Sequence, residues 1–424
     1  MKSACFLVVF RKHETEIIEI SSEMNLIYQA HDQYQARFSY STYRGDRAGD
    51  GEMQLFIWKL LLVSSVFCIS FVEAAEPLLE IKTAQKTVFG KKLAYDDKAC
   101  WVIERNGGLE QISIASVTGF RLTNQVFRPY SAAELRTDLR REFGNDFEIK
   151  GTSRYLVASA QGRAGQYLEV FDSLYREFRQ YFSVRGIEID NPEFPMVAIV
   201  FPEHQQFVKY AAQDGLTQTE GLTGYYDRRT NRVALFDDGQ VVTKKLPVSG
   251  VTDLIAAKAG ESTSLQNTMI HEATHQVAYN VGLHSRTGQT PKWIVEGLAT
   301  VFEHPDMRGA SQTSPAMRRV NRERYLWFGN YVKSRREPGS LVDLVANEGN
   351  FSRNVLDAYS EAWALTFFLM ETRGVQYTKY LQKIAARDSL RRYSALERIN
   401  DFEASFDCDL EEMERDFLRY FEKL

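Results

Sequence analysis

Two histidines and a glutamate lie close together in the middle of the chain, in the spacing H-E-x-x-H. They are His271, Glu272 and His275. On an α-helix, residues four apart share a face, so the two imidazoles can hold one metal ion. Glu272 lies about 100° further round the helix, where a general base for hydrolysis is needed. The spacing alone occurs by chance in roughly one chain in a hundred of this length, so other residues must support it.

The residues around the motif predict a helix. Apolar side chains recur at helical spacing on either side of it. Ser262, Thr263 or Ser264 can cap the start of this helix, and Gly282 can end it.

A second helix is predicted at Trp293–Ala299, and it carries Glu296 twenty-one residues after His275. Two histidines and one glutamate leave the fourth zinc position to water, as in hydrolytic zinc sites. Gly297 costs this helix about 1 kcal/mol relative to alanine, which indicates that another element packs closely against it. We expect that element to be the helix with the two histidines.

These motifs resemble those of the gluzincin zinc peptidases, in which H-E-x-x-H precedes a helix with a glutamate ligand. The form W-x-x-E-G-x-A at 293–299 is similar to that of the aminopeptidase-N-like enzymes. The segments G-L-T-G-Y-Y-D-x-x-T-N-R-V-A-L and G-L-H-S-R are similar to a secreted bacterial family known as a domain of unknown function in the peptidase MA-like group. The resemblance extends from Arg154 to Met370.

The resemblance implies a zincin-like fold and a Zn²⁺ ion held by His271, His275 and Glu296. It implies no particular substrate. The motif G-x-M-E-N, with which aminopeptidase-N-like enzymes capture a substrate amino terminus, is absent. Aminopeptidase activity is therefore unsupported.

Two further roles follow from the resemblance. Tyr359, in D-A-Y-S-E-A-W, is similar to a tyrosine that donates a hydrogen bond to the oxyanion of the transition state; the alternative is a packing residue. Val233–Phe236 corresponds to an edge strand that holds an extended substrate by main-chain hydrogen bonds; an ordinary edge hairpin stays open. The loop from Asp238 to Glu261 can form a lid over the cleft.

Other polar residues near the motif have alternative roles. His284 is a rival third ligand, but it does not fit the metzincin spacing, so we favour a surface or supporting role. Thr300 and Glu303 can each hydrogen-bond a ligand, although an exposed carboxylate is the alternative for Glu303. We expect His304 to be structural.

The composition limits the class of protein. The chain has 424 residues, a formal net charge of −4 and 44% hydrophobic residues. These values are typical of a soluble globular protein with two or three packed units. The near-neutral charge argues against a nucleic-acid partner. The oligomeric state is not apparent from the sequence.

The first part of the chain resembles a leader. From Met53 a short segment with Lys59 precedes an apolar run and the small residues Ala74 and Ala75, which is the pattern of a secretory signal peptide. The run is shorter than the roughly twenty residues of a comfortable membrane span, so an uncleaved anchor is the second choice. We expect residues 1–52 to be disordered and to represent an over-extended start.

The rest of the chain divides by pattern. Residues 76–149 predict a small antiparallel β unit, with strands at Leu78–Thr83, Ala99–Glu104 and Leu109–Ser116. Residues 150–305 predict a mixed sheet with the two metal-bearing helices, and residues 306–424 predict a helical subdomain. The expected fold class is α+β. After the signal peptide, the remaining cysteines are Cys100 and Cys408, which either form a disulfide or stay as two buried thiols.

The predicted function is a secreted or periplasmic zinc metallopeptidase with a peptide or protein substrate. Zinc polarises the scissile carbonyl and acidifies water, and Glu272 acts as the general base. One alternative is a non-catalytic, peptidase-like binding protein of the cell envelope. Another is a zinc hydrolase of a non-peptide substrate.

Overall fold

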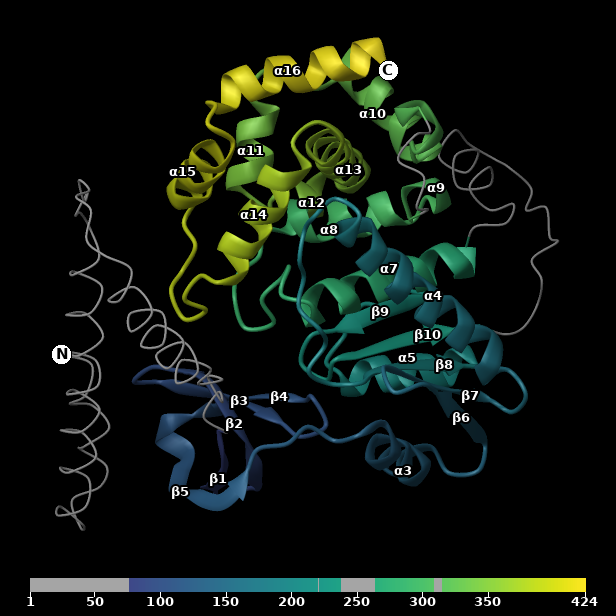
Figure 1. The fold of residues 1–424 in the computed structure, drawn as a ribbon, viewed down its shortest axis with the longest axis vertical. Coiled ribbons are helices and arrows are strands. Elements are labelled where there is room, and N and C mark those ends of the chain that lie inside the picture. Colours follow the sequence, from purple (N-terminus) through teal and green to yellow (C-terminus); the bar gives the residue numbers. More distant parts are fainter. Residues whose placement is uncertain (1–75, 220, 238–263, 309–314) are drawn as a thin grey trace, which may run out of the picture. The chain divides into compact units, whose positions relative to one another are not determined.

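The computed structural model describes residues 76–219, 221–237, 264–308 and 315–424 (Figure 1). Contacts divide the chain into Met1–Glu76 and Pro77–Leu424, and all the elements below belong to the second unit. The expected start at 1–52, the signal peptide at 53–75 and the lid loop between Asp238 and Glu261 lie outside the described residues. The described part is a mixture of helices and sheets, as the predicted α+β class requires.

The first sheet is antiparallel throughout, with the strand order β4-β3-β2-β1-β5. Its core is formed by alternate side chains, including Leu79, Val88, Val102 and Ile112. The sequence predicted three of these strands and missed β2 and β5, because most side chains of those two strands are exposed or polar. The strands are β1 (Pro77–Thr83), β2 (Thr87–Tyr95), β3 (Ala99–Glu104), β4 (Leu109–Ser113) and β5 (Val117–Val126).

The second sheet is mixed, with the strand order β6-β7-β8-β10-β9. Strands β7, β8 and β10 run parallel, and each edge strand pairs antiparallel with its neighbour. The expected boundary between residues 149 and 150 falls inside β6, so this strand belongs to the second sheet. The strands are β6 (Phe147–Gly151), β7 (Tyr155–Ala160), β8 (Met196–Phe201), β9 (Gly224–Asp227) and β10 (Arg232–Phe236).

One prediction about this sheet is wrong. Val233–Phe236 is not an edge strand, because β10 pairs with β8 on one side and with β9 on the other. Its residues Val233, Ala234 and Leu235 are fully buried, as expected of a strand covered on both faces. The edge strand next to β10 is β9, and β6 forms the opposite edge.

Helices cover both faces of the second sheet (Figure 1). Alternate strand residues such as Leu156, Ile199 and Ala234 pack with helices α3 and α5 on one face. The intervening residues, such as Val157 and Val233, pack with α4 and α7 on the other. The helices are α3 (Ala132–Phe143), α4 (Ala164–Ser183), α5 (His204–Gln213) and α7 (Ser264–Asn280).

The remainder of the chain is helical, as predicted. Helix α13 is its centre, since it is apolar on nearly all sides and packs against α8 and α10. The helices are α8 (Lys292–Phe302), α9 (Pro305–Arg308), α10 (Arg322–Ser334), α11 (Ser340–Ala346), α12 (Asn350–Arg353), α13 (Val355–Thr372), α14 (Gly374–Ala385), α15 (Ala395–Phe406) and α16 (Leu410–Lys423).

The two cysteines of the described chain do not form the disulfide considered above. Cys100 is a buried thiol of the first sheet, and Cys408 is a partly buried thiol between α15 and α16. Among the described helices, none combines the length and the apolar character that a membrane span requires.

Candidate metal centre

Helices α7 and α8 bring the three predicted ligands together. One ligand atom from each of His271, His275 and Glu296 lies within 4.8 Å of the other two. Oε2 of Glu296 is 3.3 Å from Nε2 of His271 and 3.7 Å from Nε2 of His275. The two imidazole rings are nearly perpendicular, with centroids 4.6 Å apart. The three side chains are mostly buried, so their donor atoms converge in a sheltered site.

A buried amide fixes α7 on the sheet directly beside His275. The side chain of Gln276 donates to the main-chain carbonyls of Val197 and Asn231, and it accepts a hydrogen bond from the hydroxyl of Tyr155. Each of these polar groups would be costly to bury without its partner. The rotation of α7 about its own axis is therefore fixed, and with it the direction of both histidines.

The turn between β9 and β10 reinforces this attachment. Asn231 adopts a left-handed backbone conformation, with φ of 59°. Its side-chain amide exchanges two hydrogen bonds with that of Asn280, at the end of α7. The turn thus ties the edge of the sheet to the helix that carries the metal residues.

Helix α8 approaches α13 closely at Gly297. A Cβ atom at this position would lie 2.2 Å from the hydroxyl oxygen of Thr366 and 2.6 Å from the carbonyl oxygen of Ala362. The glycine therefore serves a close contact, as predicted, but the partner is α13 and not the helix with the histidines. The physical reason is that α13 lies at the centre of the helical region and packs closely against α8.

Replacing Gly297 with alanine should lower the free energy of unfolding by about 1–3 kcal/mol, because the new methyl group overpacks this contact. Urea denaturation measures the change. Gly329→Ala is the matched control, since nothing lies within 4 Å of a Cβ atom there and the residue is also helical. Equal effects of the two substitutions would contradict the close-contact explanation.

The carboxylate of Glu303 contacts the ring nitrogen Nδ1 of His271. Oε1 of Glu303 lies 2.8 Å from Nδ1 of His271. The side-chain amide of Asn321 donates to the other oxygen of Glu303 at 2.9 Å. Asn321 also caps α10 by accepting from the main-chain N–H of Arg324. The orientation of His271 is thus set by a chain of contacts that begins at the start of α10.

The charges of the site are strongly coupled. Burial alone would lower the pKa of His271, but hydrogen bonds to Glu296 and Glu303 and the charge of Glu272 hold it well above its usual value. Burial alone would raise the pKa of Glu296, but its two histidine neighbours hold it well below. Metal ligands must be deprotonated, so a metal ion would displace a proton from His271.

The other candidate residues lie outside the ligand cluster. Nδ1 of His284 is 2.8 Å from the carbonyl oxygen of Leu283, and burial lowers the pKa of His284 to about 3. In the described chain, the metal cluster does not include His284. Thr300 donates to the main-chain carbonyl of Glu296 and not to a ligand side chain. His304 accepts from the main-chain N–H of Asp306, a structural contact at the start of α9.

Tyr359 and Glu272 lie near the ligands. The hydroxyl of Tyr359, in the first turns of α13, lies near the carboxylate of Glu296. Burial and the charges of Glu296 and Glu272 raise the pKa of Tyr359, so its hydroxyl stays protonated. The charge of Glu272 contributes to the raised pKa of both His271 and Tyr359.

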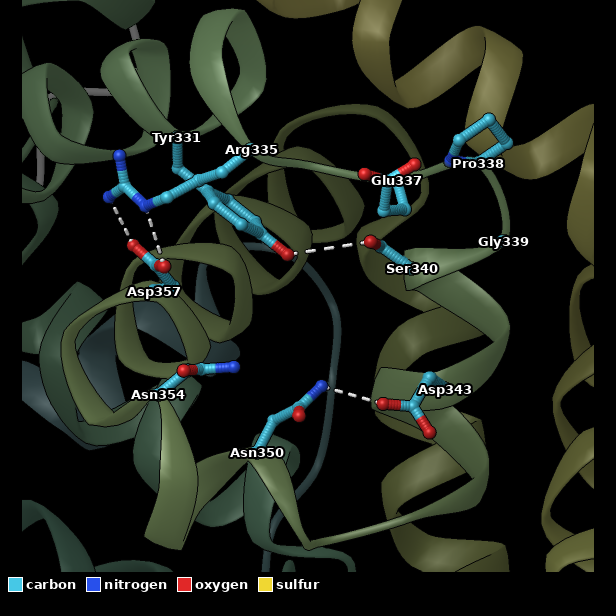
Figure 2. Close-up of a pocket in the computed structure, with 10 residues that line it drawn as sticks. All are labelled: Tyr331, Arg335, Glu337, Pro338, Gly339, Ser340, Asp343, Asn350, Asn354 and Asp357. Carbon is cyan, nitrogen blue, oxygen red and sulfur yellow. Dashed lines mark hydrogen bonds and ion pairs between the residues drawn. The ribbon is translucent and has the colours of Figure 1, made fainter.

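A cavity of about 450 Å³ opens at the start of α13, with none of the proposed metal ligands in its wall. Figure 2 shows that most of its polar groups are already paired with one another: Arg335 with Asp357, Tyr331 with Ser340, and Asn350 with Asp343. Sequence reasoning gave no signal for this cavity, since its lining comes from four separate helical segments.

Residues 266–391 match a family described as a protein of unknown function (DUF1570). No curated protein matches the chain. Among solved structures, the chain is similar to a two-domain M1 zinc metallopeptidase, crystallised as a mutant with bound L-arginine. The identity is 12% and the TM-score 0.34, over 81% of this chain and 60% of that chain. The present chain thus spans less than two thirds of that protein. Its family match includes α8, Tyr359 and α7 from residue 266 onward.

Proposed function

We propose that the protein is a zinc-dependent peptidase of the gluzincin type, with His271, His275 and Glu296 as metal ligands. The observation that carries this proposal is the convergence of three ligand atoms, within 4.8 Å of one another, from two adjoining helices. A zincin-like fold, with the metal-bearing helix packed on a mixed sheet, belongs to the same proposal.

The residues present fit zinc. Two imidazole nitrogens and one carboxylate oxygen are the ligand set of hydrolytic zinc sites, which keep a fourth position open. The carboxylate of Glu303 behind His271 is the kind of partner that orients and polarises a metal-binding imidazole. No described cysteine joins the cluster, so a cysteine-rich structural zinc site is not supported.

The chemistry divides among three groups. A zinc ion held here would polarise a carbonyl and lower the pKa of a water molecule. Glu272 accepts the proton of the attacking water and delivers it to the leaving amine. Tyr359 donates to the oxygen that gains negative charge, which its raised pKa allows because the phenol stays protonated.

We assign to β9 the role that the sequence predicted for Val233–Phe236, which is to pair with an extended substrate. The main-chain carbonyl of Thr223 accepts a hydrogen bond from the N–H of Phe236. Hydrogen-bonded positions alternate along an antiparallel pair, so the main-chain N–H and C=O groups of Gly224 and Tyr226 point away from β10. They face the side of the sheet that carries no further strand. A Cβ atom at Gly224 would meet Thr268, one turn before His271, so this edge runs beside the metal helix. An extended peptide can pair there.

The alternatives are a zinc hydrolase of a non-peptide substrate and a non-catalytic binding protein. Export by way of residues 53–75 is part of the proposal, which places the activity outside the cytoplasm. The test is a peptide-library digest with the zinc-loaded full chain, read by mass spectrometry, with chelated protein as the blank. Zinc-dependent cleavage supports the proposal. A zinc-loaded chain that cleaves no peptide favours one of the alternatives.

A further inference from the structure

Two cations lie on either side of an aromatic pair beside the metal residues. The guanidinium carbon of Arg324 is 5.8 Å from the ring centroid of Tyr359. The ammonium nitrogen of Lys292 is 5.3 Å from the ring centroid of Phe351. The two rings meet edge to face, with centroids 5.6 Å apart. The order in space is therefore cation, ring, ring, cation.

Both cations lie within about one helical turn, along the chain, of a residue of the candidate metal centre. Lys292 precedes Glu296 by four residues on α8, so the two side chains share a face. Arg324 follows Asn321 by three residues, and the side chain of Asn321 contacts Glu303. Lys292 and Arg324 are both partly exposed, so their charged groups are available to a ligand.

Several arginines of the helical region are paired with carboxylates. Arg319 faces Glu371, Arg335 faces Asp357, and Arg336 faces Glu361 and Glu414. Within the described residues, neither Arg324 nor Lys292 has such a partner. Arg324 also occupies the first turn of α10, where the helix dipole disfavours a cation.

We propose that Arg324 binds a carboxylate of the peptide substrate, while Lys292, on the far side of the ring pair, adds positive charge to the region. This inference rests on the proposed function and adds the substrate class, a peptide with an acidic group near the scissile bond. The planar guanidinium donates two parallel hydrogen bonds to a carboxylate, which gives selectivity over the isosteric amide. The carboxylate is either an acidic side chain or the free carboxyl terminus of the peptide.

The test compares acid and amide forms of the same cleaved peptide. One pair exchanges glutamate for glutamine beside the scissile bond, and the other exchanges a free carboxyl terminus for its amide. For the pair with the recognised carboxylate, kcat/KM of the acid form should exceed that of the amide by about 10- to 100-fold, as expected for hydrogen bonds to a charged group. The pair that shows the preference identifies the source of the carboxylate.

The variant Arg324→Gln should reduce this preference to near one, because the loss falls mainly on cleavage of the acid peptides. Lys292→Gln should reduce it partially. Arg322→Gln is the matched control, because Arg322 is exposed on the same helix and the net charge changes equally. If Arg324 only supports the ring of Tyr359, its loss will lower turnover of acid and amide peptides alike, and the proposal is then wrong.

Binding provides a readout that does not depend on turnover. The affinity of fluorescent acid and amide peptides is measured by anisotropy on two proteins, the Glu272→Gln variant and the Glu272→Gln, Arg324→Gln double variant. Each protein is measured with and without zinc. An acid preference that disappears with Arg324→Gln supports the proposal. Cleavage or binding with no acid preference overturns it while the peptidase function stands. Acid-selective binding without any cleavage by the zinc-loaded wild type contradicts the proposed function alone.

Discussion

Replacing Glu272 with glutamine should lower kcat by about 10²- to 10⁴-fold without loss of zinc binding, because the substitution removes the proposed general base but none of the three proposed ligands. Glutamine has the shape of glutamate and cannot take a proton from water. Glu272 follows His271 directly in α7, and its charge contributes to the raised pKa of both His271 and Tyr359, which supports the role proposed for it.

Two measurements are needed on each protein: initial rates on a peptide found by the library digest, and zinc content by elemental analysis. Glu323→Gln is the control, since this carboxylate is exposed on α10 and should change neither. Full activity of the Glu272→Gln protein would refute the mechanism. Loss of both zinc and activity would show instead that Glu272 helps to hold the metal.

Substitutions at the candidate metal centre should weaken zinc binding by different amounts. The loss of affinity should be largest at a proposed ligand and smaller at residues further from it. Glu296→Ala removes a ligand and should cause the largest loss. Glu303→Gln should weaken zinc binding by about 10- to 100-fold, since the partner of a metal-binding imidazole tunes its orientation and basicity. Asn321→Ala should have a smaller effect, because it acts on His271 only by way of Glu303.

Competition with a fluorescent zinc chelator at fixed pH gives the affinity of each variant. Circular dichroism of the zinc-free proteins shows whether the fold is retained, which matters most for Asn321 because it also caps α10. The Glu323→Gln protein again serves as the control for loss of a carboxylate. Wild-type affinity in the Glu303→Gln protein would mean that its contact with His271 has no influence on the metal.

The sequence was informative about the metal centre because the motif is local. His271 and His275 are one helical turn apart, and Glu296 lies on the next predicted helix, so helix geometry alone relates them. The supporting residues are different. Asn321 is far along the chain from the histidines, and no spacing rule connects an N-cap of α10 to a ligand on α7. Glu303 was foreseen as one of two options, but only the structure distinguishes its contact with His271 from the main-chain contact of Thr300.

The sheet edge shows where pattern reasoning fails. Val233–Phe236 was recognised as a strand, but its position in the sheet depends on which partners it finds. Its uninterrupted apolar run is typical of a strand buried on both faces, and that feature argues for an inner place. In the first sheet, β2 and β5 are largely exposed, so they lack the clear apolar alternation by which a strand is recognised in a sequence.

The prediction for Gly297 was right about a close helix contact and wrong about which helix makes it. A glycine inside a helix indicates a close approach, and the structure has one. The chain contains several apolar helices after α8, and local sequence does not say which of them comes nearest. The contact with α13 also places Tyr359 beside Glu296, so the same packing that needs the glycine brings the proposed oxyanion donor to the site.

The central claim is that His271, His275 and Glu296 hold a zinc ion. Its most direct test is the zinc stoichiometry of the purified full chain after reconstitution and dialysis, measured by elemental analysis beside a His271→Ala protein. We predict one zinc per wild-type chain and none in the variant. A wild-type chain without zinc, or a His271→Ala chain that keeps it, would contradict the assignment of the site.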